Sequence, residues 1–165
     1  MTDKFQRKIH RVISEIEEEL GNIDRLLSEL KEHRQEESRN SFYFRAVGSI
    51  LHDFYCGVER IYERIAEELN GGIPEGDSRH IQLLKDMTLQ IEEVRPPVTS
   101  KELAAELKGY LEFRHRFRNI YGFELEWNKM KGLKETLPDV AERFKKEIQG
   151  VMGFLKKLAE DTGNG

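Results

Sequence analysis

The sequence predicts an all-α fold, an antiparallel up-and-down helical bundle that begins with two long helices. Charged residues make up 35% of the 165 residues, apolar residues 38%, and only four residues are proline. A proline-poor chain rich in Glu, Lys, Arg and Leu is typical of helices and argues against β-sandwiches and parallel α/β folds. The length suits one domain over residues 1–165, with residues 160–165 as a flexible tail.

The first two predicted helices cover residues 3–37 and 41–69, with a break at residues 39–41. Apolar residues in both recur at gaps of three or four positions, which places them on one helical face. The first stripe consists of Phe5, Ile9, Val12, Ile16, Leu20, Ile23, Leu27 and Leu30, and the second of Phe44, Val47, Leu51, Phe54, Val58, Ile61, Ile65 and Leu69. Gly21 is a candidate site for a bend in the first helix. Gly57 is a candidate site where another helix crosses the second one closely.

The loop at residues 70–77 holds three glycines and one proline, and therefore ends the second helix. A third helix is predicted over residues 78–93, with Asp77 or Ser78 as its N-cap. The run Arg95-Pro96-Pro97 ends it.

Thr99 and Glu102 have the spacing of a capping box, which predicts Thr99 as the N-cap of a fourth helix. That helix is predicted to continue to Tyr121, before a weak point at Gly122. A short helix over residues 126–133 and a last helix that starts near Pro138 and runs to Glu160 complete the bundle.

The composition excludes several function classes. The net charge of −4 gives no general attraction to nucleic acid, so an RNA-related role needs a local basic patch. The chain lacks the apolar run of a membrane span and an N-terminal signal core, which predicts a cytoplasmic protein. A single cysteine, Cys56, excludes an intramolecular disulfide, and no two of the five histidines have local metal-ligand spacing. No metal and no cofactor are predicted.

The densest chemical motif is the run Phe-Arg-His-Arg-Phe-Arg-Asn-Ile-Tyr at residues 113–121. Four cations and one acid fall between residues 108 and 121. On a continuous helix, Arg114, Arg118 and Tyr121 would share one face, which favours binding of RNA phosphates. The alternative is a solvated helix whose arginines pair with acids of the second helix.

A second cluster places polar residues inside a strongly apolar helix. His52, Asp53, Tyr55 and Glu59 lie among the apolar positions of the second predicted helix. Two interpretations stay open: a buried network that supports a site across the bundle, and an ordinary core network whose polar groups are satisfied.

The run at residues 114–121 resembles the R-x4-H-x-Y motif of HepT-like proteins, a branch of the HEPN group of small helical proteins. Residues 51–66, the loop at 72–76 with the following His80, and residues 121–125 resemble the same branch. The resemblance implies a toxin of a toxin–antitoxin module, a metal-independent endoribonuclease that acts as a homodimer in which the two motifs meet. It also implies a minimal nucleotidyltransferase as antitoxin, which transfers AMP to the motif tyrosine.

Carried over by position, the resemblance makes Arg114 the catalytic arginine and Tyr121 the AMP acceptor. His115 takes the polar position after the arginine. Arg116 and Arg118, in the basic run itself, are predicted to contact RNA phosphates. His52, Asp53 and Glu59 would form the supporting network.

The sequence departs from the motif at Asn119, which occupies the histidine position. An amide cannot accept and release a proton as imidazole does. Asn119 can still hydrogen-bond the RNA, and His115 is a candidate displaced base. Two hypotheses follow: an RNA-cleaving toxin impaired by Asn119, and a non-catalytic helical dimer that binds a nucleotidyltransferase. A coiled-coil scaffold built on the first helix is a third, and it leaves the basic motif unexplained.

Overall fold

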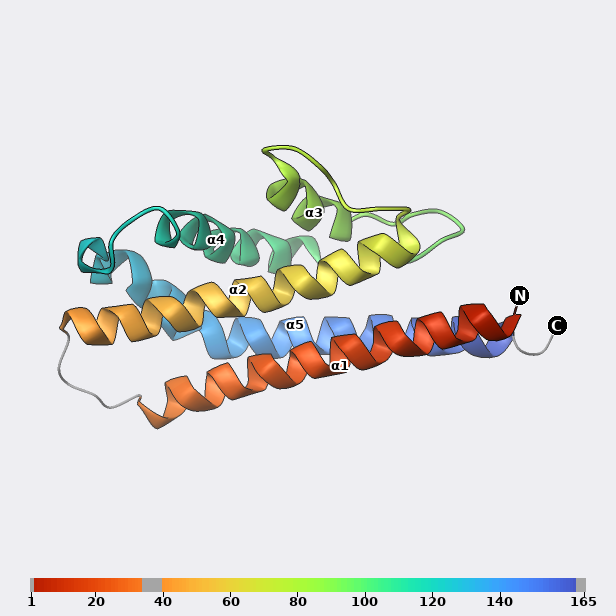
Figure 1. The fold of residues 1–165 in the computed structure, drawn as a ribbon, viewed down its shortest axis with the longest axis horizontal. Coiled ribbons are helices and arrows are strands. Elements are labelled where there is room, and N and C mark those ends of the chain that lie inside the picture. The colour runs from red at the N-terminus through yellow and green to blue at the C-terminus, as the bar shows by residue number, and fades with distance from the viewer. Residues whose placement is uncertain (1, 34–39, 163–165) are drawn as a thin grey trace.

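The computed structural model describes residues 2–33 and 40–162, and these contain five α-helices, one 3-10 turn and no strand. The elements are α1 (Thr2–Glu32), α2 (Ser41–Leu69), α3 (Arg79–Met87), α4 (Lys101–Phe117), η1 (Gly122–Glu124) and α5 (Trp127–Asp161) (Figure 1). The all-α prediction is confirmed. The end of the first predicted helix after residue 33 and residues 163–165 of the predicted tail lie outside the described residues. The predicted tail begins too early, because α5 continues to Asp161.

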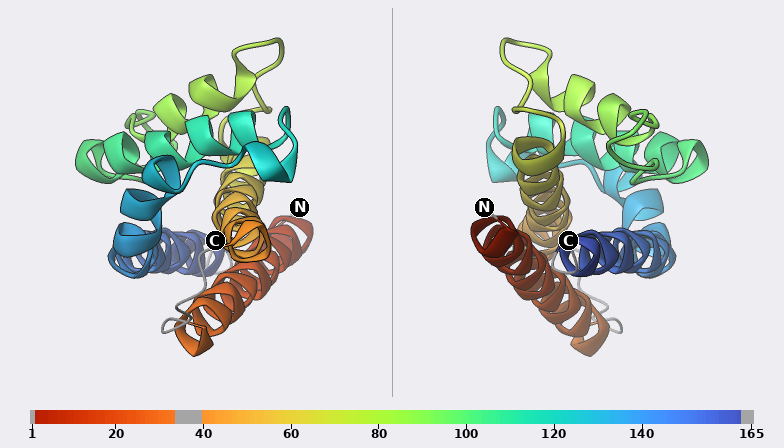
Figure 2. Two further views of the ribbon diagram at one scale, coloured as in Figure 1. Left: turned by 90° about the vertical axis from the view of Figure 1, so that its left-hand side faces the viewer. Right: turned by 90° about the vertical axis from the view of Figure 1, so that its right-hand side faces the viewer.

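Four helices form the up-and-down bundle. Helix α1 packs against α2 and α5, and α4 closes the ring by packing against α2 and α5, with neighbouring helices antiparallel (Figures 1 and 2). Helix α3 lies outside this ring, against α2 and α4. The two long N-terminal helices are confirmed, but the longest helix is α5, with 35 residues. In the described part of the chain, no helix is long and apolar enough to span a membrane.

The core is built from the two predicted stripes, except Phe5, which is exposed, and from the inner faces of α4 and α5. The largest side chains that are almost fully buried include Phe54, Tyr55, Tyr62, Tyr110 and Phe144. Gly57 lies where α1 and α2 approach closely, because a Cβ atom there would stand 3.2 Å from Ile23 Cγ1. The predicted close crossing is therefore confirmed. Gly21 lies within the continuous α1, and a Cβ there would meet nothing within 4 Å.

Helix α2 has the predicted bounds because its start is capped by a side chain. Asn40 Oδ1 accepts a hydrogen bond from the Tyr43 N–H at 3.0 Å, which satisfies one of the free donors of the first turn. After Asn70, glycines at 71, 72 and 76 adopt positive φ angles that other residues disfavour. The loop composition therefore determines where α2 ends.

The predicted third helix is too long, because α3 ends at Met87 rather than at residue 93. The chain beyond it turns around the buried Arg95, whose guanidinium donates to the Asp86, Leu89 and Pro96 carbonyls and to Asn70 Oδ1. These hydrogen bonds replace helical ones. At its start, Ser78 is the N-cap residue but makes no side-chain capping hydrogen bond.

The predicted capping box on α4 is wrong by one residue. Ser100 is the N-cap, and its Oγ accepts from the Leu103 N–H at 3.2 Å. Thr99 is buried, and its hydroxyl is 2.5 Å from Tyr62 Oη. Thr99 therefore bonds to a phenol from another helix and does not cap α4 as the local pattern predicted. Burial raises the pKa of the Tyr62 phenol.

The two helices predicted after residue 126 are one, because α5 continues through Pro138. Proline removes one helical hydrogen bond and kinks the helix, and the first turns of α5 run at an angle to the rest (Figure 2). Nearby carbonyls gain side-chain partners: Tyr110 Oη donates to the Leu133 carbonyl at 2.8 Å, and Thr136 Oγ1 donates to the Gly132 carbonyl at 2.9 Å. Burial raises the pKa of Tyr110 to about 12.

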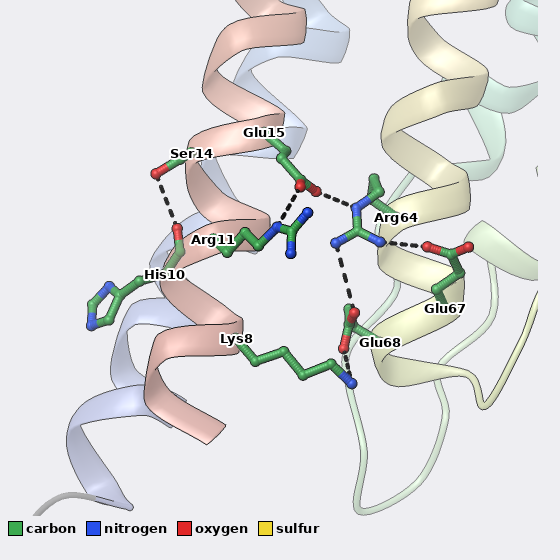
Figure 3. A network of polar contacts seen from close by, with 8 residues as sticks. All are labelled: Lys8, His10, Arg11, Ser14, Glu15, Arg64, Glu67 and Glu68. Carbon is green, nitrogen blue, oxygen red and sulfur yellow. Dashed lines mark hydrogen bonds and ion pairs between the residues drawn. The ribbon is translucent and has the colours of Figure 1, made fainter. Parts of the chain in front are cut away.

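A line of charges joins α1 to α2 on the outer surface (Figure 3). Arg64 binds Glu15 of α1 and Glu67, and lies 3.7 Å from Glu68, which in turn pairs with Lys8 of α1 at 2.6 Å. Burial on its own raises the pKa of Glu15, but hydrogen bonds from Arg11 and Arg64 outweigh it, so that this pKa is lowered.

The lowered pKa of Glu15 predicts a loss of stability in acid. Its contribution is fully present above the unfolded pKa of about 4.5 and disappears as the pH falls through the lower folded value. Glu15→Gln should therefore flatten the fall in unfolding free energy between pH 5 and pH 3, by less than about 1 kcal/mol because the pair is partly exposed. Urea unfolding across this range measures the effect. Glu18→Gln, an exposed position on the same helix, is the control, and equal slopes in both variants would contradict the prediction.

Candidate functional site

The end of α4 sets the geometry of the motif. The helix stops at Phe117, four residues before the predicted end, and Arg118 is the C-cap. Asn119 Nδ2 donates to the His115 carbonyl at 2.6 Å, which satisfies a carbonyl that the helix end leaves free. The predicted shared face of Arg114, Arg118 and Tyr121 is therefore wrong, because Tyr121 follows the helix and leads into η1.

Arg114 points into the bundle. Its side chain is only 12% exposed, Nε donates to Cys56 Sγ at 3.3 Å, and Nη2 lies 3.4 Å from Glu59 Oε1. Burial on its own lowers the pKa of Arg114, but the contacts with Cys56 and the charge of Glu59 outweigh it and raise this pKa. The guanidinium therefore stays charged and is held from two positions on α2.

Glu59 joins three helices at this point. Its side chain is 7% exposed; Oε1 lies 3.4 Å from Arg114 Nη2 on α4, and Oε2 lies 2.9 Å from His80 Nδ1 on α3. The next acid along α2, Glu63, forms no ion pair with the other described residues, and burial together with the charge of Glu59 raises its pKa, with His80 and Arg114 acting against this shift. Glu59 is thus the electrostatic centre of the site.

The other predicted supporting residues reach Arg114 through Cys56. The His52 ring nitrogens lie 3.7 and 3.8 Å from Cys56 Sγ, and Nδ1 is 3.2 Å from Asp53 Oδ1. The His52 ring also packs on Phe117. Tyr55 is buried, and burial raises its pKa.

Sequence reasoning assigned no role to Cys56 or His80. Cys56 is the single cysteine of the sequence, and the structure brings Arg114 to it from 58 residues away. His80 falls within the resembling segments, which is the one feature that could have pointed to it.

The remaining motif residues face solvent. His115, Arg116, Arg118 and Asn119 are exposed, and in the described part of the chain no ion pair joins Arg116 or Arg118 to an acid. The alternative in which the arginines pair with acids of α2 therefore fits Arg114 alone. Within residues 2–33 and 40–162, no three His, Cys, Asp or Glu side chains are grouped to hold a metal ion.

Glu59→Ala is expected to lower the free energy of unfolding by about 3 kcal/mol, because it leaves the poorly exposed Arg114 without its carboxylate. Glu63→Gln should be neutral or slightly stabilising, since it removes a charge whose raised pKa shows that the fold disfavours it. Guanidinium unfolding at neutral pH compares the two variants. Equal losses at positions 59 and 63 would show that Glu59 has no special electrostatic role.

A comparison with family models places these elements in a known group. The model described as HepT-like protein matches residues 46–155, which include most of α2, all of α3 and α4, the motif and most of α5. No curated protein and no solved structure matches the chain. The match covers more than half of the chain, and the fold has the expected all-α bundle. The chain therefore belongs to the HepT-like proteins of the HEPN superfamily.

Proposed function

We propose that the chain is a toxin of a toxin–antitoxin module whose chemistry is metal-independent cleavage of RNA. The observation that carries the proposal is the anchored Arg114, a charged guanidinium held by the buried Glu59. Next to it lie Arg116 and Arg118, two exposed arginines that pair with no acid among residues 2–33 and 40–162. These three arginines lie in the run at residues 114–121, which resembles the R-x4-H-x-Y motif of an RNA-cleaving family. In the described part of the chain, Arg114 contacts Cys56 through Nε and Glu59 through Nη2. Its Nη1 group remains as a donor for a phosphate oxygen.

The reaction is attack of the RNA 2′-hydroxyl oxygen on the adjacent phosphorus. A bond forms between the 2′-oxygen and phosphorus, the bond to the 5′-oxygen breaks, and a 2′,3′-cyclic phosphate results. Arg114 stabilises the negative charge on the phosphorane. A base must take the 2′-proton and an acid must protonate the 5′-oxygen. Asn119 does neither, so the chain as it stands is a weak nuclease.

We further propose that the active form is a homodimer in which the motifs of two copies meet, and that the chain works in the cytoplasm. Antitoxin control would use Tyr121, whose side chain is 71% exposed at η1. Its hydroxyl oxygen attacks the α-phosphorus of ATP on a nucleotidyltransferase partner. The phenolic proton is lost, pyrophosphate leaves, and AMP remains on the oxygen.

Incubation with a minimal nucleotidyltransferase and Mg-ATP tests the module. Peptide mass spectrometry should find one AMP group on Tyr121 and none on the Tyr121→Phe variant, while the buried Tyr55 and Tyr62 stay unmodified. An unmodified Tyr121 in the presence of a bound, active partner would contradict its role as the acceptor.

The alternative function is that of a non-catalytic helical dimer that binds the nucleotidyltransferase. One observation favours it: Asn119 serves the end of α4 through its hydrogen bond to His115, a structural task for which the amide suffices. This alternative predicts a stable complex and no RNA cleavage with either Asn or His at position 119.

A further inference from the structure

Two aromatic side chains stack on each other in solvent at η1. Tyr121 is 71% exposed and Phe123 is 69% exposed. Their ring centroids are 5.1 Å apart and their planes meet at 9°, so that the rings are parallel and offset. Such a pair adds nothing to the core, and the outer ring faces remain open to a third planar group.

The turn that carries this pair is held by its own hydrogen bonds. The Tyr121 N–H donates to Glu124 Oε2 at 2.7 Å, and the Glu124 N–H donates back to the Tyr121 carbonyl at 2.9 Å. Leu125, which follows, is buried and anchors the turn in the core. The backbone that carries the two rings is therefore held in a defined turn.

A cation lies directly beside the pair. A Cβ atom on Gly122, the residue between the two aromatics, would stand 2.6 Å from Arg45 Cζ, so the guanidinium of α2 lies against this backbone. Arg45 is exposed, its Nε donates to Ser41 Oγ at 3.4 Å, and no acid within residues 2–33 and 40–162 pairs with it. Arg116 and Arg118 add two further cations without such pairs at the neighbouring end of α4.

Open aromatic faces beside arginine forks complement the two parts of a nucleotide, its base and its phosphate. Bases inside a duplex have both faces covered by their neighbours, whereas unpaired bases are free to stack on protein rings. Resting on the proposed RNA-cleaving function, we propose that Tyr121 and Phe123 form a stacking platform for an unpaired base, with Arg45 binding the adjacent phosphate.

Binding to a short fluorescein-labelled RNA, alone and annealed to its complement, tests the platform by fluorescence anisotropy. The single strand should bind more tightly than the duplex. Phe123→Leu should weaken single-strand binding about 5- to 100-fold, and Phe123→Trp should retain it, because only the second keeps a ring face. Arg45→Gln should weaken binding and reduce the slope of log affinity against log salt by about 0.7, the value for one lost phosphate contact.

Two matched controls accompany these variants. Phe5→Leu alters an exposed ring in the first turns of α1, at the other end of the molecule from η1 (Figure 1), and Arg79→Gln alters an exposed arginine on α3. Both should leave RNA affinity unchanged. Equal affinity for single strand and duplex, or unchanged binding by Phe123→Leu, would overturn the proposal.

Sedimentation and cleavage separate the remaining outcomes. If Phe123→Leu converts a dimer to a monomer, the patch is an interface between copies and the platform is wrong. If an Asn119→His variant cleaves RNA while Phe123→Leu binds normally, the nuclease function stands and the platform falls. If Phe123→Leu loses single-strand binding while Asn119→His cleaves nothing, the platform stands and the nuclease function falls.

Discussion

Replacing Asn119 with histidine is expected to raise the rate of RNA cleavage by about 10²- to 10⁴-fold, the usual contribution of a positioned acid or base. Imidazole exchanges protons near neutral pH, which the amide cannot do. Position 119 is exposed, immediately beyond the end of α4, so the ring needs no space in the core. A labelled RNA incubated with EDTA and each variant measures the rate and tests metal independence together.

The same experiment needs variants that separate chemistry from folding. Asn119→Gln keeps an amide and should cleave RNA as weakly as the unsubstituted chain, whereas Arg114→Ala combined with Asn119→His should abolish the gained activity. Loss of the Asn119 hydrogen bond to the His115 carbonyl should cost only about 1 kcal/mol of stability. An Asn119→His protein that is folded and dimeric but cleaves no RNA would remove the nuclease function and leave the binding subunit.

Local sequence predicted the elements whose ends are determined by local chemistry. Helix α2 begins and ends as predicted, because the Asn40 cap and the glycine-rich loop are both contiguous in sequence. The end of α3 and the start of α4 were predicted wrongly, since Arg95 and Thr99 form hydrogen bonds with partners elsewhere in the fold. Pro138 was expected to separate two helices, but α5 continues through it with a bend.

The site was only partly predictable for the same reason. The sequence pointed to Arg114 and Glu59 through the motif and the polar cluster, and the structure brings their side chains to 3.4 Å. Cys56 on α2 contacts Arg114 on α4, 58 residues away. His80 on α3 contacts Glu59 on α2, 21 residues away. Arg45 lies close to η1 in space but 77 residues before Gly122 in the sequence. The spacing of apolar residues along the chain does not predict such a contact.

Arg95→Ala should destabilise the fold by about 3–4 kcal/mol, the largest loss expected from one side chain outside the apolar core. Arg95 is 3% exposed and donates four hydrogen bonds of 2.8–3.0 Å. Burial lowers its pKa, with the charge of Asp86 acting against this shift. Its removal takes one donor from Asn70 Oδ1 and from three backbone carbonyls, of which the Asp86 carbonyl keeps the Leu89 N–H as a donor. Each group left unsatisfied in the interior costs about 1–3 kcal/mol, less where water enters.

Arg95→Lys is the informative companion variant, because it keeps the charge but has no planar fork to reach three carbonyls and an amide at once. It should recover little of the loss, and Arg79→Ala, at an exposed arginine on α3, should change stability by less than about 0.5 kcal/mol. Guanidinium unfolding gives the three values. A loss at position 95 no larger than that at position 79 would contradict the assigned role.

The Arg95 variant should also disturb the site, because Arg95 fixes the end of the helix that carries His80. Its guanidinium joins the ends of α2 and α3 through Asn70 and Asp86, and His80 on α3 supplies the second partner of Glu59. Hydrogen exchange should therefore quicken in α3 and in residues 88–98 of Arg95→Ala, while the α1–α2 contact stays protected. Faster exchange in all helices alike would instead indicate global unfolding, with no separate role for Arg95 in holding α3 beside Glu59.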